Sequence, residues 1–586
     1  MPSPLIGIDL GTTHSLCAVF VDGAPKLIPN AHGAVLTPSV VAVADDGRVL
    51  VGEAAREWRI TRPDATASQF KRWMGEDRTV KLGDKEFTPP ELSSLVLRSL
   101  IADAEAFLET TIEEAVLTVP AYFNEHQRRA TRAAGEMAGL KVRRVLNEPT
   151  AAALSYGFHR AQKTENLLIF DLGGGTFDVT VMEIFEGSLE IRSTAGESHL
   201  GGEDFTDRLV QWALSTKGQY LEHVEMSSPL LVARLREEAE NAKRALSQQE
   251  QTQLRLPGEN GELVPEAKPL AVSRALFQET CEPLTKRLQR PTERALRDAE
   301  LAWREIDAVL LVGGATRMEL VRDLIRKWSG KEPRDEVDPD QVVALGAAVQ
   351  AALIENNEAV EDLVMTDVCP FTLGISITKE FGSQLVNGYY LPVIHRNTTI
   401  PVSREEVVQT LRNNQTEITL EIFQGEARKT EDNLKIGELA VSGIVPGPAG
   451  QEIRVRFTYD LNGLLDVEAF VTANGTRFET LLNHNVQGLS EKEIKAAHKK
   501  MAALKFYPRD DLENRRLLHF GETVIKELNS HQRGQLEHVL DSFETALDAG
   551  DKSRFKVIRQ ELLICLSGLG FPLPDASQGR GEGPSA

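Results

Sequence analysis

The 586-residue sequence contains few cysteines, few aromatic residues and no apolar run long enough to cross a membrane. Its four cysteines are widely separated and form no CxxC pair, which excludes a zinc site of paired cysteines and favours free thiols in a reducing compartment. The apolar stretch at residues 342–354 is too short for a bilayer span, and the N-terminus lacks the basic and apolar regions of a signal peptide. We therefore expect a cytoplasmic protein that contacts no membrane.

The chain also has little positive charge. It carries 66 Lys and Arg against 87 Asp and Glu, a net charge of −21, so we expect no nucleic-acid partner, because phosphates attract a positive surface. No G-x-x-x-x-G-K-[ST] motif occurs, which excludes a P-loop. The composition, with 41% hydrophobic and 26% charged residues, is nevertheless that of an ordinary folded chain.

The pattern of apolar residues changes twice along the chain. Before about residue 355, short apolar runs alternate with amphipathic stretches, as in an α/β domain. Later, apolar and polar positions alternate between two Asn-Gly turns, which predicts antiparallel hairpins, and Ser490 with Glu493 then fits the capping box of a helix. We therefore predict an α/β domain at 1–358, a linker at 359–367, a β domain at 368–487, a helical domain at 488–572 and a disordered tail at 573–586.

Two stretches far apart in the chain repeat one design. Residues 6–13 and 168–176 each form an apolar strand that ends in an aspartate, Asp9 or Asp171, followed by a turn rich in Gly and Thr and a second apolar run. Such a turn offers backbone N–H groups to a phosphate, and the aspartate can hold Mg²⁺ through water. One copy would be an ordinary turn, but two copies indicate two similar lobes that clamp one nucleotide.

Three weaker signals accompany the repeated hairpin. They are a Gly-Gly turn after an apolar strand, a Gly-Gly-Glu helix start and a polar face on a predicted helix. Each alone would be an ordinary turn or a solvated helix face, and only the repeated hairpin gives them weight. The residues are Gly313 and Gly314, residues 201–205, and Glu240, Lys243, Arg244 and Ser247.

Together these stretches closely resemble the DnaK-type molecular chaperones of the seventy-kilodalton heat-shock class. The motifs that carry the resemblance are IGIDLGTTHS, VPAYFNEHQRRAT, NEPTAAALSYG, FDLGGGTFDVT, LGGEDF, LVGGATRM, NTTIPVS and IFQGE. They extend from about residue 5 to 504, and the short helical end, the stretch at 504–509 and the compact segment at 71–120 are most like the bacterial HscC branch. The resemblance implies a multidomain fold: an actin-like (ribonuclease H-like) α/β ATPase domain of two duplicated lobes, a linker, a β-sandwich peptide-binding domain and a short α-helical lid.

The same resemblance implies an ATP-dependent chaperone. ATP binding and hydrolysis in the N-terminal domain would control the binding and release of extended apolar segments of client proteins by the C-terminal domain. The cofactors would be ATP or ADP and Mg²⁺, with K⁺ as a further candidate. The partners would be unfolded or extended client polypeptides, a J-domain co-chaperone and, as a candidate, a nucleotide-exchange factor.

The resemblance assigns a role in the nucleotide site to several side chains. Lys71 would touch the γ-phosphate and the attacking water, Glu148 would orient that water and Asp178 would support it. Asp9 and Asp171 would order the waters around Mg²⁺. The phosphate cradle would be Gly11, Thr12, Thr13, Gly173, Gly174, Gly175 and Thr176, and the adenosine side Gly202, Glu203, Glu240, Lys243, Arg244, Ser247, Gly313, Gly314, Arg317 and Asp340.

The resemblance also implies a route from ATP to the peptide site. Pro120 and Arg128 would be a switch and its relay, and the linker residues would be buried in one state and exposed in the other. These linker residues are Leu363, Val364 and Met365, and Arg144, Asp367 and Arg396 would lie at the interdomain contact. The peptide pocket would use Ile375, Ile377, Val408, Leu411, Ile418, Leu420 and Ile453, positions that equally suit a sandwich core.

Departures from the family pattern occur in both halves of the chain, and those in the C-terminal half, together with the short lid, favour a narrow client range. His14 stands where the family usually has Asn; it could bring a modest pH dependence near neutrality, but we give it no catalytic role. Residues 384–392 form a longer, Tyr-bearing connection, and Ala449 replaces an expected arginine. A small-molecule kinase or a filament-forming ATPase on the same scaffold remains an alternative, although neither needs a β domain and a lid.

Overall fold

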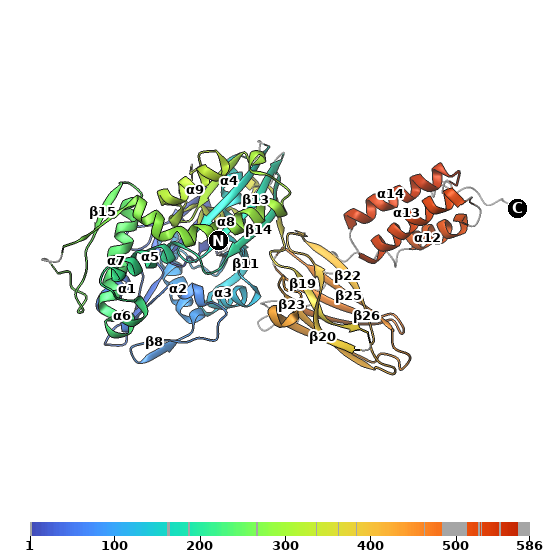
Figure 1. The fold of residues 1–586 in the computed structure, drawn as a ribbon, viewed down its shortest axis with the longest axis horizontal. Helices are drawn as coiled ribbons and strands as arrows, with labels where there is room; N and C mark the ends of the chain where they lie inside the picture. Colours follow the sequence, from blue (N-terminus) through green and yellow to red (C-terminus); the bar gives the residue numbers. More distant parts are fainter. Residues whose placement is uncertain are drawn as a thin grey trace. The chain divides into compact units, whose positions relative to one another are not determined.

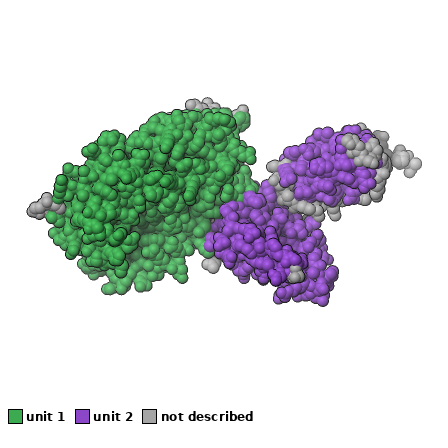
Figure 2. Space-filling view, viewed as in Figure 1, with its two compact units in different colours: residues 1–371, 396–400 green, residues 372–395, 401–586 purple. Residues whose placement is uncertain are grey.

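The structure is a computed structural model that describes residues 3–571, apart from positions 161–163, 186–187, 265–267, 336, 361–362, 383, 462, 483–511, 526–527, 529 and 550–551. The chain forms two compact units: unit 1 comprises residues 1–371 and 396–400, and unit 2 comprises residues 372–395 and 401–586 (Figures 1 and 2). The predicted capping box at Ser490 and Glu493, the predicted boundary at 487–488, the stretch at 504–509 and the predicted tail lie outside the described residues.

The first sheet of unit 1 is built around a hairpin. β1 and β2 are antiparallel, and β10 and β11 continue the sheet parallel to β1. Ile6, Ile8 and Leu117 have no exposed surface, because these strands are apolar on the faces that helices cover. In spatial order the strands are β11 (Lys141–Asn147), β10 (Glu114–Val119), β1 (Ile6–Asp9), β2 (His14–Val21) and β3 (Ala24–Ile28), with β4 (Thr37–Pro38) paired to β2.

The second sheet of unit 1 repeats this design. β12 and β13 are antiparallel with Asp171 opposite Asp178, and β17 runs parallel to β12. Both predicted hairpins are therefore confirmed, and an aspartate stands at or near the end of the first strand of each. In spatial order the strands are β17 (Ala308–Val312), β12 (Glu165–Leu172), β13 (Phe177–Phe185), β14 (Ser188–Glu197), β18 (Val364–Val368) and β21 (Thr399–Ile400).

Helices and small sheets complete unit 1, as Figure 1 shows. Two helices begin at capping boxes that the sequence encodes, Thr88 with Glu91 and Asn124 with Gln127. The helices are α1 (Glu53–Thr61), α2 (Pro89–Leu108), α3 (Glu125–Met137), α4 (Glu148–Arg160), α5 (Gly202–Ser215), α6 (Leu221–Ser227), α7 (Pro229–Leu246), α8 (Arg274–Asp298) and α9 (Glu319–Ser329). The small sheets are β5 (Val40–Val43) with β6 (Val49–Val51) and β7 (Thr66–Ser68), β8 (Val80–Leu82) with β9 (Lys85–Phe87), and β15 (Gln251–Leu254) with β16 (Leu270–Ser273).

Helix α10 (Val342–Ile354) is the apolar stretch noted in the sequence, and it is a core helix. It packs against α4 and against β1, β2 and β10 of the first sheet. Small residues permit this close packing: a Cβ on Gly346 would meet the Ala151 carbonyl oxygen at 1.7 Å, and one on Gly7 would meet the Ala347 carbonyl carbon at 2.4 Å. Within the described part of the chain, no helix is long and apolar enough to cross a membrane.

The segment predicted as a linker contributes a strand to unit 1. β18 pairs in parallel with β14, with Val364 opposite Ser188 and Met365 opposite Leu189. Its other edge pairs with β21 through Asp367 and Val368. Positions 361 and 362 of the predicted linker lie outside the described residues.

Unit 2 contains two antiparallel sheets of four strands, as the alternating apolar pattern predicted. The hairpin of β25 and β26 turns at Gly463 and that of β26 and β27 turns at Gly475, and both glycines have positive φ angles, 75° and 72°. One sheet is β20 (Gln384–Ile394), β19 (Leu373–Phe381), β23 (Glu417–Gln424) and β24 (Leu434–Ser442). The other is β22 (Val402–Gln409), β25 (Glu452–Tyr459), β26 (Leu465–Val471) and β27 (Thr476–Leu482).

The described residues after the sheets form the helices α12 (Leu512–Ile525), α13 (Ser530–Ala549) and α14 (Lys552–Gly568). They share a small apolar core that includes Leu517, Phe543 and Leu562. The four cysteines of the chain are free, and all except the partly exposed Cys565 are buried, as their spacing predicted.

Candidate nucleotide site

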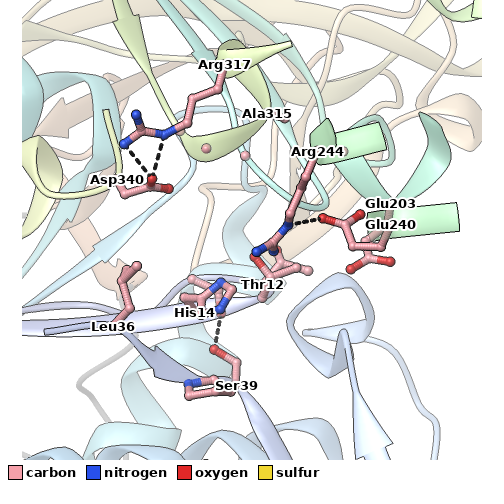
Figure 3. A pocket seen from close by; sticks show the side chains of 18 of the residues that line it. Thr12, His14, Leu36, Ser39, Glu203, Glu240, Arg244, Ala315, Arg317 and Asp340 are labelled. Carbon is pink, nitrogen blue, oxygen red and sulfur yellow. Dashed lines mark hydrogen bonds and ion pairs between the residues drawn. The ribbon is translucent and has the colours of Figure 1, made fainter. Parts of the chain in front are cut away.

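A cleft of about 890 Å³ opens in unit 1 between the two repeated hairpins. Residues from both sheets, from α1 and α7 and from the loop after β17 line it (Figure 3). The cleft brings together all the residues assigned to the nucleotide from the sequence except Gly175 and Asp178. Those that line it are Asp9, Gly11, Thr12, Thr13, Lys71, Glu148, Asp171, Gly173, Gly174, Thr176, Gly202, Glu203, Glu240, Lys243, Arg244, Ser247, Gly313, Gly314, Arg317 and Asp340.

The two glycine-rich turns approach each other so closely that side chains would collide. A Cβ on Gly174 would stand 2.4 Å from Thr13 Cγ2, and one on Gly175 would stand 2.7 Å from Thr12 Cγ2. The start of α5 holds the second turn, because the backbone N–H groups of Gly202 and Glu203 donate to the carbonyl oxygens of Gly173 and Gly174, both at 2.9 Å. The turns therefore form a rigid cradle lined by backbone, which suits a phosphate.

Three aspartates lie beside the cradle: Asp171 and Asp178 are buried, and Asp9 is half-buried. The Thr118 hydroxyl donates to Asp9 Oδ1 at 3.1 Å, and the backbone N–H groups of Ala121 and Tyr122 donate to the Asp178 carboxylate at 3.2 and 3.1 Å. Burial, followed by the negative charge of Glu148, raises the pKa of Asp9 and of Asp178 to about 7. The same two causes raise the pKa of Asp171 well above its ordinary value.

A buried ion pair faces these aspartates. Lys71 Nζ lies 2.6 Å from Glu148 Oε1, and the Lys71 side chain is only 3% exposed. Lys71 stands on a 3₁₀ turn at residues Phe70–Trp73, and its ammonium also lies 5.6 Å from the centre of the Phe123 ring. One cation thus stands among four carboxylates, which leaves a strong negative potential at this end of the cleft.

The carboxylates fit a hydrated divalent cation. Asp171 Oδ2 is buried and has no hydrogen-bond partner among the described atoms, so it is free to accept from a metal-bound water. Hard cations such as Mg²⁺ keep several waters and take carboxylate oxygens as ligands or as water acceptors. In the described residues no three His, Cys, Asp or Glu side chains converge as direct metal ligands.

A polar network on α7 and α5 lines the other side of the cleft. Lys243 Nζ donates to the Gly202 carbonyl oxygen at 2.7 Å and pairs with Glu240 at 2.6 Å, and Arg244 Nε donates to Glu240 at 2.7 Å (Figure 3). Burial raises the pKa of Glu240, but Lys243, Thr206 and Arg244 outweigh it and lower the pKa to about 2. Glu240 therefore stays ionised and holds both cations in place.

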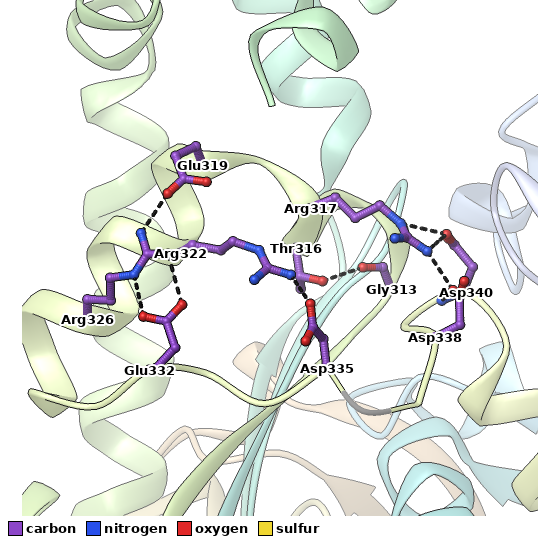
Figure 4. Close-up of polar contacts among 10 residues, drawn as sticks. All are labelled: Gly313, Thr316, Arg317, Glu319, Arg322, Arg326, Glu332, Asp335, Asp338 and Asp340. Carbon is purple, nitrogen blue, oxygen red and sulfur yellow. Dashed lines mark hydrogen bonds and ion pairs between the residues drawn. The ribbon is translucent and has the colours of Figure 1, made fainter. Parts of the chain in front are cut away.

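Ion pairs also connect parts of the segment between β17 and α10, which includes α9. Arg317 donates to Asp340 and to Asp338, at 2.9 and 2.6 Å, as Figure 4 shows. Gly314 lies under this pair, because a Cβ there would stand 2.5 Å from Asp340 Oδ1. Further ion pairs on α9 join Arg322 to Asp335 and Arg326 to Glu319 and Glu332, so this wall of the cleft is rigid.

His14 lies in the cleft wall but does not titrate near neutrality. Burial, followed by the positive charge of Arg244, lowers the pKa of His14 to about 4. The modest pH dependence near neutrality considered from the sequence is therefore wrong, because the ring is already neutral there.

Several residues that complete the site were not singled out from the sequence. Arg72 on the turn beside Lys71 pairs with Asp204 on α5 at 2.5 Å, and this pair joins the two sides of the cleft next to the phosphate cradle. Thr118, Arg56 and Arg59 contact Asp9 or line the cleft. Arg72 adjoins Lys71 and Asp204 stands in LGGEDF, but only the fold reveals that they pair across 132 positions.

Two of the residues predicted to couple the site to the linker, Arg128 and Asp367, are joined inside unit 1 by hydrogen bonds through Asn147, which the sequence did not single out. Arg128 donates to the Ala121 and Phe123 carbonyl oxygens and to Asn147 Oδ1, the last at 2.6 Å. Asn147 in turn donates to Asp367 Oδ2 at 3.2 Å, and the Thr150 hydroxyl donates to the same oxygen at 3.1 Å. Asn147 immediately precedes Glu148. The residue that bonds to β18 is therefore the sequence neighbour of the glutamate in the cleft's ion pair.

The remaining coupling residues lie around the same strand. Arg144 donates to Gln350 on α10 at 2.8 Å, and Arg396 pairs with Asp298 on α8 at 2.9 Å. Pro120 accepts from the Phe123 N–H at the start of the turn that leads to α3. Leu363 and Met365 are partly buried against the core, whereas Val364 is 57% exposed.

The predicted peptide residues come from both sheets of unit 2. Ile375 (on β19), Ile418 and Leu420 (on β23) belong to one sheet, while Val408 and Ile453 stand opposite each other on β22 and β25 of the other. Ile375, Leu420 and Ile453 are buried, as core residues are. Ile377 and Ile418 are half-buried, and Leu411 is 46% exposed.

Together, the repeated hairpins and the cradle of glycines with its acidic floor define an α/β protein that binds a nucleotide phosphate with a divalent cation. The chain matches the family model for Hsp70 protein over residues 5–81 and 77–558. It is 39% identical over 581 residues to the chaperone protein DnaK of Thermotoga petrophila, with 95% of each chain covered, and equally similar to the DnaK proteins of Thermotoga maritima and Thermotoga neapolitana. The chain belongs to the Hsp70 family.

The protein is therefore an ATP-dependent molecular chaperone and an ATPase, as its motifs predicted. Members of the family bind ATP or ADP with Mg²⁺ and act on unfolded client peptides together with co-chaperones. The match covers both units, which favours the chaperone over the kinase and filament alternatives.

Proposed function

We propose that the cleft of unit 1 is the site of ATP hydrolysis, as an actin-like domain of two duplicated lobes, and that unit 2 binds client peptides as a β-sandwich with a helical lid. The observation that carries the proposal is the buried Lys71–Glu148 pair beside the unpartnered Asp171 oxygen, below two glycine turns. Phosphoryl transfer needs positioned charge more than covalent chemistry, and these groups supply it.

In this proposal each group in the cleft has one task. The backbone of Gly11–Thr13 and Gly173–Thr176 binds the β- and γ-phosphates, and Lys71 neutralises charge that develops on the transferred group. Glu148 accepts a hydrogen bond from the attacking water and holds it in line, and Asp178 supports that water. Asp9 and Asp171 accept hydrogen bonds from waters of a bound Mg²⁺, which supplies charge neutralisation to the phosphates. K⁺ is a further candidate ion.

The polar network on α5 and α7, together with the Arg317–Asp340 pair, would bind the adenosine. Glu240 holds Lys243 and Arg244 in fixed positions, and Arg317 is held by Asp340. Fixed cations and a glycine floor at Gly202, Gly313 and Gly314 fit a ribose and an adenine ring without a large rearrangement.

Coupling would run through Asn147. Movement of Glu148 on ATP binding alters the position of its neighbour Asn147, and Asn147 holds Asp367 of β18. Arg128, fixed to Asn147, links the same point to the turn at Pro120. The strand β18 would therefore pair with β14 in one nucleotide state and leave it in the other, which makes it a two-state element.

The same proposal includes the client range, the co-chaperones and the location of the protein. A narrow, HscC-like client range is supported by the departures at 384–392 and at Ala449 and by the short helical end of the chain. A J-domain co-chaperone and a nucleotide-exchange factor would serve the cycle. A cytoplasmic location is supported by the four free cysteines.

The test is steady-state ATP turnover of the wild type and of Lys71→Ala, with and without an extended Leu-rich peptide. We expect slow turnover that the peptide accelerates, and loss of turnover in Lys71→Ala with retained nucleotide binding. Lys435→Ala is the matched control, because Lys435 is an exposed lysine of unit 2 that pairs with Glu421 and Glu438. Unchanged turnover in Lys71→Ala would contradict the assignment of the site.

A further inference from the structure

The hairpin of β19 and β20 separates from the hairpin of β23 and β24 partway along their sheet, and each continues as a two-stranded ribbon. β19 pairs with β23 only at Leu373, Gly374 and Ile375, whereas its pairing with β20 continues to Phe381. From Ser376 onward, therefore, the edge of β19 that faces β23 has no backbone partner among the described residues. An open strand edge of this kind can pair with an extended chain.

A cluster of cations lies on this extension. The ring of Tyr389, which stands opposite Ile377, has Lys429 Nζ at 3.5 Å from its centre and Lys379 Nζ at 5.3 Å. The Arg428 guanidinium lies 5.5 Å from the same centre, and the Phe381 ring lies 5.6 Å away. The electron-rich face of one tyrosine thus gathers three positive side chains from two separate segments.

These three cations are not neutralised by neighbouring acids. No carboxylate among the described residues lies within ion-pair distance of Lys379, Arg428 or Lys429, whereas Lys435 of the same unit pairs with Glu421 and Glu438. The nearest acids in sequence are otherwise placed: Glu380 follows Lys379 on β19 and therefore points to the other face of the strand, and Glu426 bonds to Thr372. Glu431 and Asp432 lie on a 3₁₀ turn without an ion pair to the cluster. Three adjacent cations repel one another, so an anion placed among them relieves that repulsion.

Exposed apolar side chains surround the cluster. Phe381 is 53% exposed and Leu385 is 52% exposed, while the Tyr389 ring itself is 7% exposed. Lys379 and Arg428 are exposed as well. The extension therefore presents apolar contact area and unpaired positive charge on one surface, in a chain whose net charge is −21.

We propose that this surface, formed by Lys379, Phe381, Tyr389, Arg428 and Lys429, selects client segments in which acidic residues flank the apolar residue that enters the peptide pocket. The proposal rests on the proposed peptide-binding function of unit 2. Ile375, Ile377, Lys379 and Phe381 alternate along β19, so the pocket and the cluster share one face of one strand.

The distance between the peptide pocket and the cluster determines which position of the client peptide must be acidic. Lys379 is four residues beyond Ile375, or roughly 13 Å at about 3.3 Å per residue. A peptide that runs along the open edge of β19 would place an acidic side chain beside Lys379, three or four residues from its anchored aliphatic residue. Arg428 and Lys429 reach over the Tyr389 ring from the outer edge of β20 and add their charge from that side. Lysine or arginine at the same place would meet like charges and would be disfavoured.

The test is the binding of fluorescein-labelled peptides to the full-length protein in the presence of ADP, followed by anisotropy. Each peptide has a central Leu triplet and, three and four residues away, a pair of Glu, Gln or Lys. We expect the Glu peptide to bind about 3- to 20-fold more tightly than the Lys peptide at low salt, because exposed ion pairs are individually weak, and the preference to shrink at high salt. Lys429→Gln and Lys379→Gln should each reduce the preference without changing affinity for the Gln peptide, and Lys435→Gln should leave it unchanged.

The outcomes separate the selectivity from the binding function. Equal affinity for the Glu and Lys peptides, with normal binding of the Gln peptide, would overturn the proposed selectivity and leave peptide binding intact. A preference that survives in Lys379→Gln/Lys429→Gln would also overturn it, because the charge would then come from elsewhere. Failure to bind any of the three peptides would overturn both the selectivity and the peptide-binding function.

Discussion

The ion pair of Arg72 and Asp204 should control how quickly the cleft releases its nucleotide. Arg72 stands on the turn beside Lys71 and Asp204 stands in the first turn of α5, so the pair joins opposite sides of the cleft. Asp204→Asn removes the charge but keeps an oxygen that can accept from the Gly201 N–H, which Asp204 Oδ2 now does at 2.8 Å. The start of α5 should therefore survive the change, while the connection across the cleft weakens.

The size of the effect follows from the burial of the two side chains, which are 14% and 24% exposed. Exposed pairs contribute less than about 1 kcal/mol, and breaking a fully buried pair costs about 3–5 kcal/mol, so we take about 1–3 kcal/mol for this intermediate case. Since 1.4 kcal/mol corresponds to about tenfold, the open cleft should become roughly 5- to 100-fold more populated relative to the closed one. Release of bound nucleotide should accelerate by a similar factor.

The assay is stopped-flow release of a fluorescent ADP analogue, combined with single-turnover hydrolysis of ATP. We expect faster release with a hydrolysis rate that changes much less, because the substituted Asp204 pairs with Arg72, whereas Lys71 and Glu148 pair with each other. Arg236→Gln is the control, since Arg236 pairs with Asp207 at 2.9 Å but lies outside the cleft lining. Unchanged release in a folded Asp204→Asn variant, or equal acceleration in Arg236→Gln, would refute the reasoning.

Three further predictions address other parts of unit 1. Gly174→Ala should abolish nucleotide binding in calorimetry, because its Cβ would meet Thr13 Cγ2 at 2.4 Å, and Thr13→Ser in the same chain should restore part of it by removing that methyl group. The folded-state pKa of His14, about 4, lies below its unfolded value of 6.5. The unfolded chain therefore binds a proton first, and the free energy of unfolding decreases as the pH falls from 6.5 to 4. The melting temperature of the wild type should therefore drop more than that of His14→Asn over this range, with no change in their difference above pH 7. Asp367→Asn should weaken the bonds from Asn147 and Thr150, so peptide should no longer accelerate ATP turnover although basal turnover persists; retained acceleration would argue against the route through Asn147.

The sequence predicted the parts of the site that rest on local pattern. The strands that end near Asp9 and Asp171, the turns after them and the Gly-Gly turn at Gly313 are all recognisable within a dozen residues, and the structure contains them. That these strands and turns lie in one cleft could be inferred only because the pattern of strand, aspartate and glycine-rich turn occurs twice. Lys71 and Glu148 are 77 positions apart, and their roles came from the resemblance to a family rather than from pattern.

Other features depend on tertiary contacts that no local pattern encodes. The pairing of Arg72 with Asp204 and the bond from Thr118 to Asp9 join residues more than a hundred positions apart. The charge state of His14 could not be inferred from the sequence, because it depends on burial and on Arg244 rather than on its neighbours in sequence. The cluster around Tyr389 was visible in the sequence only as a longer connection, since its cations come from two segments.

The position of α10 has a consequence for the order in which the protein acquires its structure during synthesis. The helix begins at residue 342, yet it fills the space beside β1 and β2, which are made first. Gly7 and Ala347 are in contact, so the core of the first sheet stays incomplete until some 350 residues have been translated. The N-terminal strands therefore wait, with apolar surface uncovered, for a helix that leaves the ribosome many seconds later at about 5–20 residues per second. A chaperone of this architecture has itself a long interval in which it needs protection from aggregation.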